Sequence, residues 1–66
     1  MDVGKIRWFS VPLGYGFIER DDGKSFYVHY TDLRVQGPER PKPGERVEFE
    51  IHETLKGAQA TRVNRV

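Results

Sequence analysis

Two short aromatic stretches contain the residues of this chain that could do chemistry. Residues 14–18 have the sequence Gly-Tyr-Gly-Phe-Ile, and residues 26–30 have the sequence Phe-Tyr-Val-His-Tyr. Flat aromatic rings on a sheet are typical of surfaces that stack on unpaired nucleic-acid bases. The residue types therefore favour contact with bases, provided that the rings lie on the outside of the molecule.

The alternation within the two stretches predicts which side chains point outward. Each stretch is typical of a β-strand, whose successive side chains point to opposite faces. The Asp22-Gly23 pair between them indicates a hairpin with a type I′ turn. If Ile18, Phe26 and Val28 fill the inside of a small barrel, one row of side chains is left in water. That row consists of Tyr15, Phe17, Tyr27 and His29.

The alternative is that these rings belong to the core, because aromatic side chains bury large areas. A chain of 66 residues, however, has too little bulk to cover both faces of a sheet. Tyr15 and Tyr27 also carry hydroxyl groups, which tolerate a wet surface. We therefore expect the rings to lie outside.

The chain as a whole predicts five strands and no substantial helix. The expected strands cover residues 4–10, 15–20, 25–30, 46–54 and 58–64. Residues 46–54 show the clearest alternation of apolar and polar side chains. Residues 11–14 and 56–57 are expected turns, and residues 31–45, rich in proline and glycine, form a long connection with one possible helical turn near 31–33.

Two of the expected strands break the period of two. Ile6 and Trp8 have the same parity, yet we expect Ile6 inside and Trp8 outside. Ala58, Ala60 and Val63 do not share a parity, which indicates a β-bulge or strong coiling. A closed five-stranded antiparallel barrel would remove exposed edges, and the oligonucleotide-binding (OB) barrel is a member of that class. We predict this all-β fold.

Composition limits the function further. We expect one domain over residues 1–66, without disulfides or cysteine-ligated zinc because the chain has no cysteine. No apolar run is long enough to cross a membrane and no leader precedes the domain, so we expect a cytoplasmic protein. Eleven basic and ten acidic residues give a net charge of +1, unlike a typical duplex-DNA binder. Binding would depend on stacking more than on a basic field.

In the order and spacing of its aromatic motifs, the chain resembles the cold-shock domain family. Residues 5–9 (Lys-Ile-Arg-Trp-Phe) are similar to the family's first strand. Residues 14–18 resemble its first ribonucleoprotein motif, and residues 27–30 (Tyr-Val-His-Tyr) resemble its second. The likeness continues through residues 47–51 and 57–60, so it covers nearly the whole chain. The resemblance implies the same OB barrel and the binding of single-stranded nucleic acid.

The resemblance also implies a binding surface of ten residues. These are Lys5, Arg7, Trp8, Tyr15, Phe17, Tyr27, His29, Tyr30, Lys56 and Gln59. The rings would stack on bases, while Lys5, Arg7 and Lys56 would neutralise phosphates. Gln59 could hydrogen-bond a base edge, because an amide both donates and accepts. Two roles are equally open for Phe9: it could support the other rings, or it could contact a base.

Four positions depart from the family pattern. Leu13 stands where the family usually has lysine, and Pro38 stands where many members have a further stacking ring. Ser10 replaces a common asparagine, and Pro12 stiffens the same turn. These departures concern affinity more than the mode of binding.

The function predicted from these residues is that of a monomeric nucleic-acid chaperone that binds single-stranded RNA and DNA, without cofactor, metal, membrane or small-molecule substrate. The alternative is a barrel that binds an extended or proline-rich peptide. An enzyme is not expected, because the chain has no Ser-His-Asp set, paired-carboxylate signature or phosphate-binding loop. His29 could in principle be a base or a metal ligand, but we assign it to contact with a nucleic-acid base, and we expect no role for His52.

Overall fold

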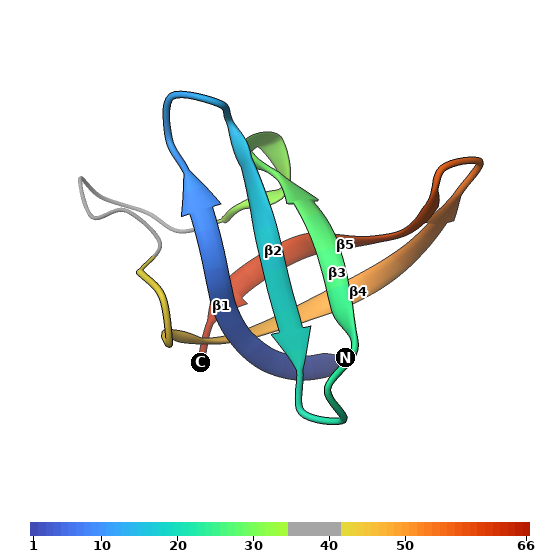
Figure 1. The fold of residues 1–66 in the computed structure, drawn as a ribbon. Helices are drawn as coiled ribbons and strands as arrows, with labels where there is room; N and C mark the ends of the chain where they lie inside the picture. The colour runs from blue at the N-terminus through green and yellow to red at the C-terminus, as the bar shows by residue number, and fades with distance from the viewer. Residues whose placement is uncertain (35–41) are drawn as a thin grey trace.

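The computed structural model describes residues 1–34 and 42–66, which form five strands and one short 3₁₀ helix (Figure 1). The elements are β1 (Asp2–Ser10), β2 (Tyr15–Arg20), β3 (Ser25–His29), η1 (Tyr30–Asp32), β4 (Arg46–Thr54) and β5 (Gly57–Arg65). The five predicted strands are confirmed to within two residues at each end. The helical turn begins at Tyr30, one residue earlier than expected, so Tyr30 belongs to η1 instead of β3.

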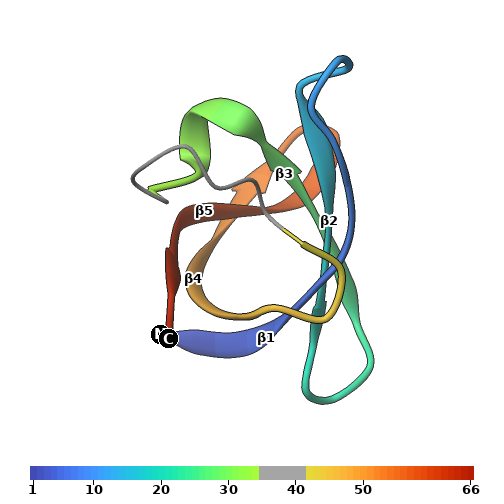
Figure 2. The same ribbon diagram turned by 90° about the vertical axis from the view of Figure 1, so that its left-hand side faces the viewer.

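The strands close into a barrel in the order β1-β2-β3-β5-β4, with β4 pairing back onto β1 (Figure 2). In Figure 1, β1, β2 and β3 lie side by side while β4 and β5 cross behind them. Four junctions are antiparallel, but β3 runs parallel to β5, with Tyr27 opposite Gln59. A ring with an odd number of strands cannot alternate direction at every junction. The predicted OB barrel is therefore confirmed, with one parallel junction.

Among residues 1–34 and 42–66, eight apolar side chains from all five strands fill the interior. They are Ile6, Ile18, Phe26, Val28, Val47, Phe49, Ala60 and Val63. The predicted inward positions of β2 and β3 are among them, which confirms the predicted alternation in both strands. Ile51 on β4 is only half-buried and packs against the edge of this core.

A β-bulge in β1 resolves the parity conflict of that strand. Ile6 pairs with Ile18, but Trp8 pairs with Phe17, so β1 has one extra residue, Arg7, between the two pairs. Ile6 is consequently buried, whereas Arg7 and Trp8 are both exposed. The bulge thus lets two residues of the same parity lie on opposite faces.

A second irregularity lies in β5, where the sequence also broke parity. Glu48 pairs with Asn64 and Glu50 pairs with Thr61, so β5 has one residue more than β4 over this stretch. Arg62 lies in the gap with a φ of +50°, the one positive φ among the described non-glycine residues. Ala60 and Val63 can therefore both point inward, and the predicted bulge is confirmed.

Gly16 allows β1 and β2 to approach closely beneath the aromatic face. A Cβ atom built at Gly16 would lie 2.2 Å from the carbonyl oxygen of Trp8 and 2.6 Å from the ring of Phe9. Such contacts require the backbone to move, so a side chain does not fit there. Glycine between Tyr15 and Phe17 therefore has a structural reason, independent of any ligand.

Within residues 1–34 and 42–66, no helix has the length and apolar character needed to cross a lipid bilayer.

The β2–β3 turn differs from the predicted type I′ turn. The amide of Gly23 donates to the carbonyl oxygen of Arg20 at 2.8 Å, and the amide of Arg20 donates to that of Lys24 at 2.7 Å. Gly23 has a φ of +92°, whereas Asp22 has no positive φ. This is a three-residue loop that ends in a left-handed glycine. The hairpin was predicted correctly and the turn type was wrong.

Asp22 holds this turn through both of its carboxylate oxygens. The guanidinium of Arg20 donates to them at 3.0 and 2.7 Å, and the amide of Lys24 donates to Oδ1 at 3.1 Å. The hydrogen bonds from Arg20, followed by that from Lys24, lower the pKa of the Asp22 carboxyl from 3.8 to about 2. The folded state thus favours the ionised carboxylate.

This lowered pKa makes a prediction about stability in acid. The contribution of Asp22 is fully present above its unfolded pKa near 4 and is lost as the pH falls through about 2. We expect Asp22→Asn to weaken the dependence of the unfolding midpoint on pH over that window. Thermal unfolding of both proteins from about pH 5 to about pH 2 measures it. Glu53→Gln, an exposed change on β4, is the control, and identical acid profiles for Asp22→Asn and the wild type would contradict the prediction.

Candidate nucleic-acid interface

Four rings form one continuous cluster on the outer face of β1, β2 and β3. This aromatic platform consists of Trp8, Tyr15, Phe17 and Tyr27. The centroid of Tyr15 lies 5.5 Å from that of Trp8 and 5.6 Å from that of Tyr27, with the two tyrosines stacked. Phe17 lies 6.2 Å from both Trp8 and Tyr27. Each ring therefore contacts at least two others of the cluster on the outer face of the sheet.

The ten residues predicted as a binding surface all reach the surface. Six are exposed, namely Lys5, Arg7, Trp8, Phe17, Tyr30 and Lys56. The other four are half-buried, namely Tyr15, Tyr27, His29 and Gln59. Trp8 is 41% exposed and Phe17 38%, in contrast to Phe49, a core ring with no exposure. The outward placement expected for the platform rings is confirmed.

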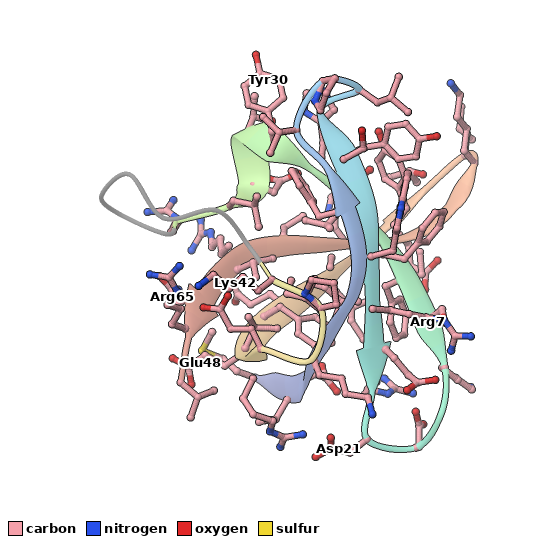
Figure 3. The ribbon with its side chains drawn as sticks, turned by 60° about the vertical axis from the view of Figure 1, so that its left-hand side comes forward. Arg7, Asp21, Tyr30, Lys42, Glu48 and Arg65 are labelled. Carbon is pink, nitrogen blue, oxygen red and sulfur yellow. The ribbon has the colours of Figure 1, made fainter. Side chains whose placement is uncertain are left out.

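His29 and Tyr30 form a second ring pair beside the platform. Their centroids are 4.6 Å apart, and His29 is the cross-strand partner of Tyr15. The Nδ1 atom of His29 lies 2.9 Å from the hydroxyl oxygen of Thr31 and 3.4 Å from its amide nitrogen, so it caps η1. The other ring nitrogen, Nε2, is then the one left for an external partner. Tyr30 is 58% exposed, and Figure 3 shows its side chain on η1.

A groove runs from β3 to the β4–β5 turn. Its lining is Tyr27, His29, Thr54, Leu55, Lys56, Gly57, Ala58 and Gln59. The side-chain amide of Gln59 donates to Asp32 at 3.1 Å, which leaves its carbonyl oxygen as an acceptor. Lys56 stands in the turn beside the fully exposed Leu55. The groove thus continues the platform towards a cation and a polar amide.

The two cations of β1 face a carboxylate that the sequence analysis missed. Glu19 on β2 lies 2.7 Å from Arg7 and 3.8 Å from Lys5. Glu19 has the same outward parity as Tyr15 and Phe17, so the alternation of residues 15–19 could have indicated it. The cations at this edge of the platform are therefore partly neutralised within the protein.

Two of the four residues that depart from the family pattern, Pro12 and Leu13, lie in the β1–β2 turn, and Ser10 is the last residue of β1. Leu13 is 63% exposed, and its amide donates to the hydroxyl of Ser10 at 3.3 Å. Pro38 lies outside the described residues.

Phe9, whose role the sequence left open, is half-buried against the core and close to Gly16, which favours a supporting role.

Among residues 1–34 and 42–66, no group of three or more histidine, aspartate or glutamate side chains is placed to hold a metal ion. His52 is exposed on β4 between Ile51 and Glu53.

The strand order and the closed ring define the class of protein. A closed five-stranded barrel with an exposed face over three consecutive strands is an oligonucleotide-binding barrel. A solved structure supports this fold. The structure of this chain is similar to that of "drosophila Unr CSD456", with a TM-score of 0.80 and 20% sequence identity. That likeness covers 98% of this chain and 26% of the other.

The sequence comparisons identify the family within this class. The model of the "'Cold-shock' DNA-binding domain" matches residues 2–66, so the chain belongs to the cold-shock domain family. A cold shock-like protein of Thermotoga maritima is 45% identical over 60 residues, which are 91% of each chain. Cold shock protein CspC of Bacillus subtilis is 34% identical over 98% of each chain, and CspB of Bacillus caldolyticus is 40% identical over 96% of each. The predicted resemblance is confirmed, and with it membership of a nucleic-acid-binding family.

Proposed function

We propose that residues 1–66 form one domain that binds single-stranded RNA and DNA on its aromatic platform. One observation carries the proposal: four adjoining rings lie partly in water on β1, β2 and β3, beside Lys5 and Arg7. Ring faces stack on any unpaired base, while the cations meet the phosphates that follow. The low net charge of +1 fits a mode in which stacking dominates.

The bases would lie along the platform and enter the groove towards Lys56. His29 would offer Nε2 and Gln59 its carbonyl oxygen to base edges, since their other atoms hold Thr31 and Asp32. Tyr30 would extend the stacking surface beyond η1. Because every base has a π-face, sequence preference would be modest.

This mode of binding supports the role of a nucleic-acid chaperone. A protein that holds unpaired strands by stacking opposes the formation of weak secondary structure. No step of this process needs a cofactor or covalent chemistry, so we propose a binding protein and no enzyme. Monomeric state and a cytoplasmic location are further parts of the proposal. Duplexes should bind poorly, because paired bases cannot offer their faces and the A-form major groove is too narrow for side chains.

The direct test is a titration of Trp8 fluorescence. We expect a short oligothymidylate to quench the emission of Trp8, because a stacked base would cover an indole that is 41% exposed. An RNA hairpin stem of equal length should bind much more weakly. Fluorescence anisotropy of a labelled oligonucleotide checks binding independently. Equal affinity for stem and single strand, or a response only to a proline-rich peptide, would refute the proposal.

Truncation of single platform rings separates binding from folding. We expect Phe17→Ala and Tyr27→Ala each to weaken binding by about 1–3 kcal/mol, because each removes a stacking face. The barrel should remain folded, since neither ring belongs to the core. Phe49→Ala is the matched control and should cost roughly 3–5 kcal/mol of stability. Denaturant unfolding and oligothymidylate titration of each variant give the two quantities, and unfolding of Phe17→Ala would count against the face assignment.

Leu13 tests the contribution of charge in the β1–β2 turn. The family resemblance places a lysine there, and Leu13 is 63% exposed, so Leu13→Lys should add a phosphate contact at little cost in stability. We expect higher affinity and a slope of log K against log salt that is steeper by about 0.7. Binding of oligothymidylate at several salt concentrations measures the slope. Parallel salt plots for variant and wild type would show that residue 13 does not face the backbone.

A further inference from the structure

Glu19 continues the outward row of β2 beyond the platform. Tyr15, Phe17 and Glu19 point to the same side, with buried Gly16 and Ile18 between them. Glu19 pairs across the sheet with Lys5 of β1. A carboxylate therefore stands at the end of a row whose other members are aromatic.

The bulge in β1 brings a second cation to this carboxylate. The extra residue, Arg7, lies outside together with Trp8, and its Nη1 atom is 2.7 Å from Oε2 of Glu19. The Nζ atom of Lys5 is 3.8 Å from Oε1 of the same side chain. Glu19 thus engages both cations of β1 that we assign to phosphate contact.

We infer that Glu19 competes with the phosphates of a bound nucleic acid for Lys5 and Arg7. Glu19 thereby limits the affinity of the site. This inference rests on the proposed function and adds to it a residue that lowers affinity. Lys5, Arg7 and Glu19 together carry a charge of +1, so an approaching phosphate meets half the positive charge that Lys5 and Arg7 alone would present. A bound phosphate must also lie close to a carboxylate of like charge, which opposes binding.

The opposite role for Glu19 would be to position Arg7 for phosphate. Side-chain exposure argues against it, because the side chains of Lys5 and Arg7 are 52% and 62% exposed, and solvent weakens ion pairs at such positions. Arg7 is also held through a single nitrogen, not through a bidentate pair that would fix its plane. Surface pairs of this kind restrain their members weakly. Competition and positioning predict opposite signs, so the sign of one measurement decides between them.

The experiment compares Glu19→Gln with Glu50→Gln. Both changes raise the net charge from +1 to +2, but Glu50 pairs with Arg62 at 3.4 Å on β4 and β5, the two strands that carry none of the platform rings. We expect Glu19→Gln to bind a labelled oligothymidylate about two- to fivefold more tightly at roughly 50 mM salt, the scale of a surface ion pair. Its log K–log salt slope should steepen by up to about 0.7 between roughly 50 and 200 mM. Glu50→Gln should show a smaller gain.

A double-mutant cycle with Arg7→Gln identifies the route of the effect. The gain from Glu19→Gln should shrink when Arg7 is absent, because part of the competition is for that guanidinium. Glu19→Thr, which suits a half-buried strand position, is a second variant, and circular dichroism verifies that each variant is folded.

Each other outcome counts against the inference. Weaker or unchanged binding by Glu19→Gln, or an equal gain in Glu50→Gln, overturns the role of Glu19 and leaves the proposed function standing. A wild-type protein that binds no oligothymidylate overturns the proposed function, and this inference falls with it.

Discussion

The barrel has one interior, and within the described part of the chain eight apolar side chains fill it. Because the strands close around that interior, each strand has one face inside and the other in water. On β3, Phe26 and Val28 point inward, so Tyr27 between them must point outward. The same alternation on β2 places Tyr15 and Phe17 outside. The exposed aromatic face is thus a consequence of closure, and it holds whatever the local preference of aromatic residues for burial.

Closure also explains the irregular places in two of the strands. A barrel needs strands that bend and coil, and a bulge provides both through one extra residue. In β1 the extra residue is Arg7, which moves Trp8 onto the outer face beside the rings of β2. In β5 the irregularity lies at Arg62 and lets Ala60 and Val63 both reach the core. A perfectly regular β1 would have turned Trp8 inward.

Local pattern was sufficient to predict the strands and the outward position of the platform rings on β2 and β3. Alternation is a property of neighbouring residues, so it can be read without knowing what lies across the sheet. The break in parity at Ile6 and Trp8 was visible too, but its cause depends on pairing with β2. The ion pairs of Glu19 depend on the same register, which is why they were missed. The predicted type of the turn at Asp22 was wrong, because side-chain hydrogen bonds from Arg20 to Asp22 stabilise a three-residue loop.

The platform rings also show how a small protein tolerates an exposed aromatic face. Phe17 contacts Trp8, Tyr15 and Tyr27, mostly edge to face, and such pairs stabilise by about 0.5–1.5 kcal/mol each beyond burial. Contacts between neighbouring rings therefore offset part of the free-energy cost of leaving the rings partly exposed to water. The ring faces that remain open are those that a base can cover, whereas the nearby cations already face Glu19. On the proposed function, apolar contact would provide most of the affinity, and the ion pairs at the edge would set how much the phosphates add.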